Sequence, residues 1–205
     1  MNSYITERFS PFFIPSLIFF CRLTSYSFAT TLEMKRDESA LLTFKAFITS
    51  DPHNMLKLNW STRTSVCSWI GVTCDSHGTR VTRSKIPNME LVGSIPPEIG
   101  NLDSLVSLDI SGNHLHGPIA ASVFNMSVID SIILSNTNSS GRLPEDICRH
   151  NRLQRLKILD LSLNNLEGDI PLSLAECPQL ETVEFSGNSL SGHVPREIGN
   201  MTRLK

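Results

Sequence analysis

Leu153 to Pro171 read LQRLKILDLSLNNLEGDIP. The apolar residues of this stretch follow neither the period of about 3.6 of an amphipathic helix nor, along its whole length, the alternation of a strand. Asn164 interrupts them, and Gly168 and Pro171 close the unit. A unit of this kind is typical of one coil of a leucine-rich solenoid, and recurrence along the chain tests that interpretation.

The unit does recur. The apolar position in the middle of each expected strand is occupied, copy by copy, by Ser84, Leu108, Ile132, Leu159 and Val183, and a sixth copy begins at Met201. Successive copies are spaced by 24, 24, 27, 24 and 24 residues. Repetition at this period is the signature of a leucine-rich solenoid. The three extra residues fall within Glu145–Arg152, between strand-forming parts, so we expect them on the convex side.

The expected fold is an α/β leucine-rich-repeat solenoid, right-handed, with a parallel concave sheet and a helical, disulfide-bonded N-terminal cap. We expect a signal peptide at 1–29, the cap at 30–77, and five repeats and the start of a sixth at 78–205. Asn113, Asn164 and Asn188 are expected to satisfy backbone groups at the turn after each strand. Thr137 and Ser139 replace the asparagine and leucine of the third copy, which should make that copy less stable.

The N-terminus contains thirteen residues without charge, from Phe9 to Cys21. A membrane-spanning helix needs about 20 apolar residues, so this stretch favours a secretory signal, with Ser27 and Ala29 before the cut. An uncleaved anchor is the alternative. No other stretch of the sequence is apolar enough to span a bilayer. The net charge of −2 gives no basic excess for binding nucleic acid.

The segment after the signal predicts the cap. Asp37 is expected to be the N-cap of a helix that ends at Asp51-Pro52. One face of this helix would cover the first coil, and Trp60 and Trp69 would wedge between helix and coil. The apolar residues of that face are Ala40, Leu41, Phe44, Phe47 and Ile48.

Four cysteines remain after the signal, an even number in an oxidising compartment. Cys67 and Cys74 enclose six residues, and a bridge between them would stabilise the fold by roughly 2.5 kcal/mol in the entropy model. Two free thiols are the alternative. Cys148 and Cys177 either form a second bridge that pins the insertion or leave Cys177 as a buried free thiol.

Four sequons for N-glycosylation indicate a glycoprotein. They stand at Asn59, Asn125, Asn138 and Asn200.

Cap and repeats together carry a family resemblance. The sequence DESALLTFK at 37–45, NWS at 59–61, CSWIGVTC at 67–74 and GSIPPEIGNL at 93–102 resembles the cap and first repeats of plant leucine-rich-repeat receptor-like proteins. It is most similar to receptor-like kinases of the group containing immune receptors for bacterial patterns. The resemblance implies an extracellular module that binds a peptide or protein ligand, and then a co-receptor kinase, in signalling or defence. It also implies a plasma-membrane location, reached through a C-terminal region that this chain lacks.

The outward residues of the expected strands form columns on the concave face. The acids Asp109, Asp160 and Glu184 share the central column, which suggests a basic ligand; the alternative is an ordinary solvated sheet. The candidate ligand-binding residues are Arg83, Lys85, Ser107, Asp109, Ser131, Ile133, Ile158, Asp160, Thr182 and Glu184.

The motifs of a phosphate loop, a nucleophile elbow and a zinc protease are absent from the sequence. His114 and His116 are two residues apart, but we expect them to be unligated. No catalysis, metal or cofactor is therefore expected. Because the chain stops inside its sixth repeat without a second cap, we expect a fragment of a longer product. The alternative is a small secreted protein, such as an inhibitor of a microbial cell-wall-degrading enzyme.

Overall fold

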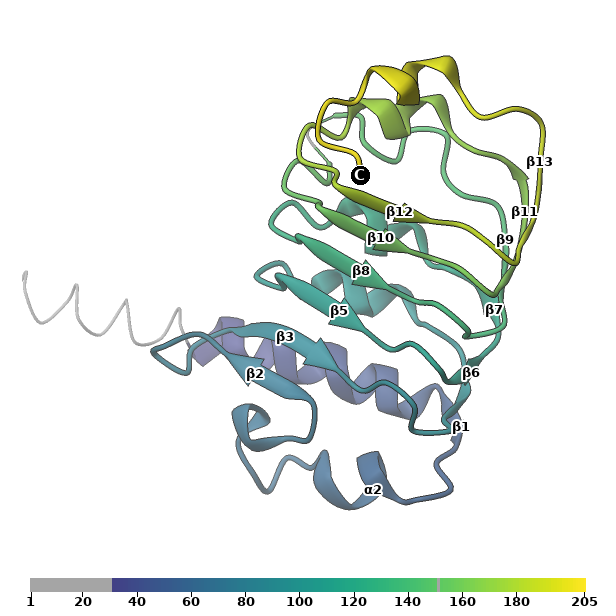
Figure 1. Cartoon of the computed structure of the whole chain (residues 1–205). Coiled ribbons are helices and arrows are strands. Elements are labelled where there is room, and N and C mark those ends of the chain that lie inside the picture. The colour runs from purple at the N-terminus through teal and green to yellow at the C-terminus, as the bar shows by residue number, and fades with distance from the viewer. Residues whose placement is uncertain (1–30, 151) are drawn as a thin grey trace, which may run out of the picture.

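The computed structural model describes residues 31–150 and 152–205. The expected signal peptide lies outside them. The predicted solenoid is confirmed: short strands stack one above another from the cap to the C-terminus (Figure 1). The six-stranded concave sheet has the order β12-β10-β8-β5-β3-β2 and is parallel except for β2. Its strands are β2 (Val72–Cys74), β3 (Val81–Lys85), β5 (Ser107–Asp109), β8 (Ser131–Ile133), β10 (Ile158–Asp160) and β12 (Thr182–Glu184).

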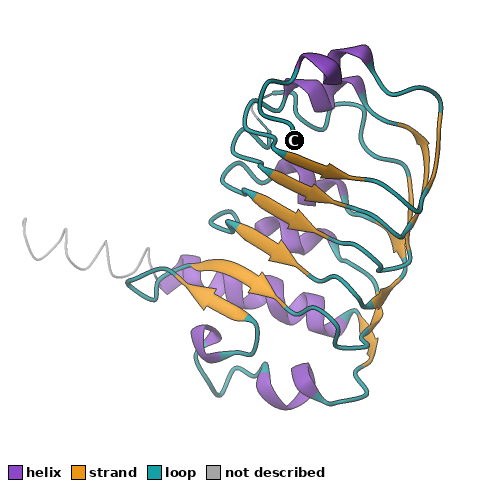
Figure 2. Cartoon of the chain, in the orientation of Figure 1, coloured by secondary structure: helices purple, strands orange, loops and turns teal. Residues whose placement is uncertain are grey.

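Two smaller sheets form the flank of the coils, where the chain leaves the concave face. One contains β1 (Ile48–Ser50), β4 (Val92–Gly93) and β6 (His114–Leu115), and the other contains β7 (Gly117–Pro118), β9 (Ser139–Gly141), β11 (Asn165–Asp169) and β13 (Ser189–Ser191). Short helices lie on the side of the coils away from the concave sheet (Figure 2). They are η2 (Pro97–Asn101), η3 (Ala121–Asn125), η4 (Leu172–Glu176) and η5 (Arg196–Asn200).

A continuous apolar core runs through the coils. Leu108, Ile132 and Leu159 point inward from the middle of their strands and are completely buried. The core positions repeat in every coil, so each leucine stacks on its equivalents, and a well-buried leucine contributes roughly 1.5–3 kcal/mol. The extra residues after β9 do not disturb the sheet, because Leu159 of β10 still pairs with Ile132 of β8.

The asparagines satisfy the turns as predicted, and each also reaches the preceding coil. Asn113 Oδ1 accepts hydrogen bonds from Met89 N and Leu91 N, both at 3.1 Å. Its Nδ2 donates to Ile86 O at 2.9 Å and to Ile110 O at 2.8 Å. One amide therefore joins two coils.

The cap helix differs from the prediction. It covers residues 31–46 of the described chain, so the assignment of Asp37 as its N-cap was wrong. Phe47 lies in a turn and is 44% exposed, while Ile48 begins β1, so neither extends the buried helical face. The helix ends early because its chain pairs with the first coil through β1 and β4.

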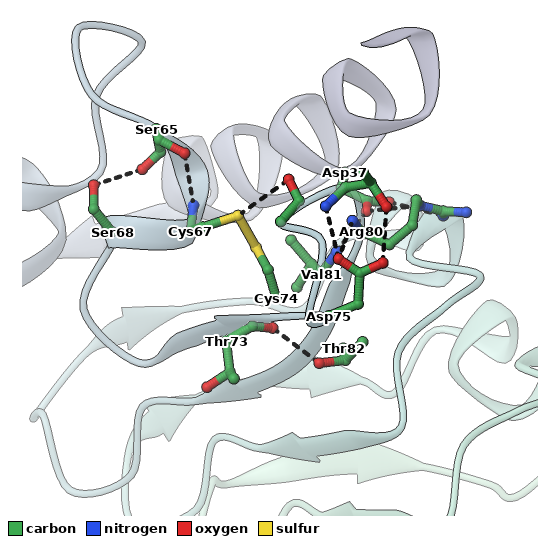
Figure 3. The surroundings of a disulfide bond; sticks show 12 residues. Asp37, Ser65, Cys67, Ser68, Thr73, Cys74, Asp75, Arg80, Val81 and Thr82 are labelled. Carbon is green, nitrogen blue, oxygen red and sulfur yellow. Dashed lines mark hydrogen bonds and ion pairs between the residues drawn. A yellow bond between two sulfur atoms is a disulfide. The ribbon is translucent and has the colours of Figure 1, made fainter. Parts of the chain in front are cut away.

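Asp37 instead anchors the helix to the first coil (Figure 3). Its carboxylate is completely buried and pairs with Arg80, at 3.0 Å to Nε and 3.1 Å to Nη2. It also accepts a hydrogen bond from Val81 N at 2.8 Å. The Asp37 carboxylate raises the pKa of Arg80, and Asp103 of the next coil, also paired with Arg80, acts in the same direction. Removing one partner of such a pair leaves a buried charge uncompensated.

The remaining cap residues pack as predicted. Trp60 and Trp69 are buried and stacked, with ring centroids 5.5 Å apart, and Phe44 of the helix lies 6.2 Å from Trp60. The cap also contains α2 (Met55–Asn59) and η1 (Val66–Ser68). Cys67 and Cys74 form a disulfide beside the Asp37 anchor (Figure 3).

A second disulfide joins Cys148 to Cys177. Of the two alternatives for these residues, the structure contains the bridge and not a buried free thiol. Both cysteines are buried on the convex side, where the bridge connects the segment after β9 to the segment after β11. It therefore pins the 27-residue coil to its successor.

Candidate ligand-binding face

The strand register aligns the candidate residues into two columns on the concave sheet. Asp109 on β5 pairs with Ile133 on β8, which pairs with Asp160 on β10. The central column contains Lys85, Asp109, Ile133, Asp160 and Glu184. The column two residues earlier contains Arg83, Ser107, Ser131, Ile158 and Thr182.

These columns are not uniformly accessible. Ser107 and Ser131 are only 6% and 9% exposed, so they offer little surface to a ligand, and a binding role for them stays a prediction. Their side chains are too short to rise above their neighbours on the sheet. The exposed members are Arg83, Lys85, Ile158 and Glu184, and the half-buried ones are Asp109, Ile133, Asp160 and Thr182.

Two of the three central acids are held in place by serines. Asp109 Oδ1 accepts hydrogen bonds from Ser111 Oγ at 2.7 Å and from Ser111 N at 3.2 Å. Asp160 Oδ1 accepts the same pair from Ser162, at 2.7 Å and 3.0 Å. Each carboxylate therefore has a fixed orientation with its second oxygen still available. The recurrence of Asp-x-Ser was the sequence signal for this arrangement, because aspartate commonly bonds the backbone two residues on.

One margin of the face has its own ion pair. Glu181 Oε2 accepts a hydrogen bond from Lys205 Nζ at 2.9 Å. This contact lowers the pKa of Glu181, and the charge of Lys157 acts in the same direction. Lys157 and Glu181 are neighbours on adjacent coils, since Glu181 N donates to Lys157 O at 2.9 Å.

The expected glycosylation sites lie away from the concave sheet. Asn125 and Asn200 end the convex helices η3 and η5, Asn138 immediately precedes β9 on the flank, and Asn59 ends α2 in the cap. All four are exposed. Glycans at these positions would leave the strands of the concave face uncovered.

The structure brings together no set of metal ligands at the two neighbouring histidines. His114 lies in β6, His116 follows it, and both are exposed on the flank. Within residues 31–150 and 152–205, no three His, Cys, Asp or Glu side chains are grouped as a metal site would require. Over the same residues, no helix is long and apolar enough to cross a bilayer.

Comparisons with known proteins agree with this architecture. A leucine-rich-repeat N-terminal domain matches residues 34–75, and leucine-rich repeats match residues 104–126, 155–177 and 179–201. Phytosulfokine receptor 1 of Arabidopsis thaliana is 31% identical over 192 residues, which cover 82% of this chain and 19% of the receptor. The chain thus spans about a fifth of the length of that relative.

Solved structures give the same result. The Arabidopsis receptor kinase HAESA ectodomain, in complex with an IDA peptide hormone, is 34% identical with a TM-score of 0.74; the match covers 84% of this chain and 28% of that one. A chain of the Arabidopsis BIR3–SERK2 complex is 31% identical with a TM-score of 0.70, and the match covers 78% of this chain and 86% of that one.

The named relatives are receptors and receptor kinases, so the similarity does not favour the alternative of a secreted enzyme inhibitor. Cap, repeats and relatives lead to one conclusion: the chain belongs to the family of leucine-rich-repeat ectodomains of plant receptor kinases.

Proposed function

We propose that the concave face of this chain binds an extracellular peptide or protein ligand, as the N-terminal part of a receptor kinase ectodomain in signalling or defence. The observation that carries the proposal is a pre-formed sheet whose exposed residues come from consecutive coils in register. A surface of this kind binds without the conformational-entropy cost of ordering loops, because its residues are fixed before the ligand arrives. The four sequons lie outside this sheet, so glycans on them would leave it open to a ligand, which supports the concave face as the binding surface.

The relatives suggest the partners. One solved neighbour is a complex with a peptide hormone, and another is a complex between two receptor proteins. We extend both roles to this chain: a peptide or protein ligand, followed by a co-receptor kinase. A protein kinase and a membrane anchor would belong to a longer parent protein, since the relatives are several times longer than this chain.

We also propose the route to the cell surface. Residues 1–29 would act as a signal peptide, followed by the cap at 30–77 and the repeats from 78. The two disulfides fit an oxidising compartment. Mass spectrometry of the secreted chain tests this directly, since a mature N-terminus at about residue 30 and glycans on the four sequons are expected.

A glycan placed on the concave face tests the binding site. Ile133 sits in the centre of the sheet and is followed by Leu134 and Ser135, so Ile133→Asn creates the sequon Asn-Leu-Ser in one step. The probe is a pool of phage-displayed random dodecapeptides selected on the secreted wild-type chain. Ile133→Gln is the matched control, since it adds an amide without creating a sequon.

The selected pool should bind the wild type and Ile133→Gln but lose binding to the glycosylated Ile133→Asn protein. Equal retention of the pool by all three proteins would overturn the concave-face proposal. The same pool tests the basic-ligand hypothesis. If the central acids recognise basic groups, replacing Asp109, Asp160 and Glu184 together by lysine should abolish retention of peptides rich in lysine and arginine.

A further inference from the structure

The fourth repeat differs from the other repeats in the residue type at one position of the turn after the strand. The residue four places after the central strand residue is left-handed in every coil, with φ of 54°, 64°, 54°, 54° and 68°. Asparagine and glycine adopt this conformation readily, whereas a leucine there is under strain. The five residues are Asn88, Gly112, Asn136, Leu163 and Gly187.

Leu163 does not occupy this position for the sake of the core. Its side chain is 59% exposed. It lies against the next coil, because a Cβ atom added to Gly187 would lie 2.7 Å from Leu163 Cδ2. Gly187 therefore leaves the space that Leu163 fills. An exposed apolar side chain on a strained backbone, with no core role, is the kind of outlier that indicates a functional constraint.

The same repeat exposes a second apolar residue. Ile158 opens β10 and is 38% exposed, while the equivalent residues of the two preceding strands are the buried Ser107 and Ser131. Asp160 lies between Ile158 and Leu163 along the chain. The fourth repeat thus presents an apolar, an acidic and an apolar side chain within residues 158–163, from the start of β10 to the turn that follows it. We call Ile158, Asp160 and Leu163 the recognition row.

The charge around the row is negative and uncompensated. Glu184 on β12 pairs in register with Asp160 and is exposed. Across the described residues, neither carboxylate has an ion-pair partner within 4.0 Å. Lys157, the basic residue nearest in sequence, lies beside Glu181, whose backbone N donates to Lys157 O at 2.9 Å. A cationic group supplied by a ligand would be the missing partner for Asp160 and Glu184.

We infer that the recognition row binds an extended peptide segment in which a lysine or arginine is flanked by apolar side chains. This inference rests on the proposed function and names the ligand chemistry for that site. Alternate side chains of an extended peptide point to the same side and lie about 6.7 Å apart. The expected motif is therefore apolar-x-Lys/Arg-x-apolar, with one more residue allowed before the second apolar position.

Each side chain of the motif is assigned to residues of the receptor face. The cationic group lies between Asp160 and Glu184, where charge-assisted hydrogen bonds form. The apolar side chains cover Ile158 and Leu163, which removes apolar surface from water on both partners. A few well-buried residues, arginine among them, carry most of the binding free energy of an interface.

Selection of random dodecapeptides on the secreted wild-type chain should enrich the motif. A synthetic peptide with that motif should then bind Leu163→Asn at least about tenfold more weakly, the loss expected for one buried leucine contact. Leu163→Asn should melt at the same temperature as the wild type or higher, since asparagine occupies the equivalent position 136. A loss of affinity without a loss of stability separates recognition from folding.

Asp160→Ala should remove the preference for lysine and arginine. Asp160→Asn must be avoided, because it would create the sequon Asn-Leu-Ser at 160–162. Leu172→Asn is the matched control, since Leu172 is an equally exposed leucine on the convex helix η4 and its replacement should leave affinity unchanged.

Unchanged affinity of Leu163→Asn, or a selected pool without the motif, would overturn the inference. If such a pool still loses binding to the glycosylated Ile133→Asn protein, the inference fails and the concave-face proposal stands. If peptides with the motif bind that glycosylated protein as well as the wild type, both fail.

Discussion

The third and fourth repeats lie side by side in register, yet their turns are built differently. The fourth has Asn164, whose Oδ1 accepts hydrogen bonds from Thr137 N and Ser139 N, at 3.1 Å and 2.9 Å. The third has Thr137, whose hydroxyl donates to Leu134 O within its own coil at 2.9 Å. The asparagine therefore supports the coil before it, whereas the threonine hydroxyl contacts its own coil and Asn164 Oδ1 of the next coil, at 2.9 Å.

This difference decides which coil loses hydrogen bonds when a repeat departs from the pattern. Asn113, Asn164 and Asn188 each donate to a carbonyl of the preceding coil, namely Ile86, Leu134 and Leu161. Thr137 makes no such contact to the second coil in the described structure. The sequence predicted a less stable third copy, but the missing support belongs to the junction between the second and third copies.

The largest effect is expected from breaking the core that both repeats share. Leu159→Asp places a carboxylate at a completely buried position, and the cost should exceed about 4 kcal/mol because no partner is available. Circular dichroism should show loss of cooperative unfolding. Ile158→Asp, one residue away and facing outward, is the control and should keep a cooperative transition. Equal behaviour of the two variants would contradict the assigned strand alternation.

The next effect concerns the bridge that holds the third repeat to the fourth. Replacing Cys148 and Cys177 together by alanine opens a 29-residue separation, which should cost roughly 3.5 kcal/mol in the entropy model. The same change at Cys67 and Cys74, separated by 7 residues, should cost roughly 1 kcal/mol less. Urea titration of both double variants measures the difference. A smaller loss for the longer loop would mean that the insertion is ordered without its bridge.

Asn164→Ala tests the turn of the fourth repeat and its support of the third. It leaves Thr137 N, Ser139 N and Leu134 O without their side-chain partner, which should cost roughly 3 kcal/mol. Asn188→Ala should cost roughly half as much, because Asn188 is only half-buried and makes fewer such bonds. Hydrogen exchange should show the loss in the third coil. Protection lost only within the fourth coil would contradict the cross-coil role.

The sequence was sufficient for features that depend on local spacing. Matched positions such as Leu108 and Leu159 predicted the strands and core, because every coil repeats the same environment. Asp37 was misplaced because its role is set by Arg80, 43 residues away, and helix propensity does not report such a pairing. The alternation that predicts an outward-facing residue likewise does not predict how far neighbouring side chains cover it, so the burial of Ser107 was missed. The left-handed Leu163 was readable by aligning it with Gly112 and Asn136.

Thr137→Asn restores the repeat pattern and is the mildest test of the comparison. Because it also creates the sequon Asn-Asn-Ser at 137–139, both this variant and the wild type are produced without N-glycosylation. The new amide should reach Ile110 O, as Asn164 reaches Leu134 O, and a net gain of about 1 kcal/mol is expected for the added hydrogen bonds. Part of the gain is offset by the lost contact between Thr137 Oγ1 and Ser139 Oγ, now 2.9 Å. Thr137→Val, which fills the same volume without a hydroxyl, should destabilise. Hydrogen exchange should place the gain in the second coil, since an amide at this position supports the coil before it. Stabilisation confined to the third coil would show instead that threonine is a local defect and that the coils do not depend on their successors.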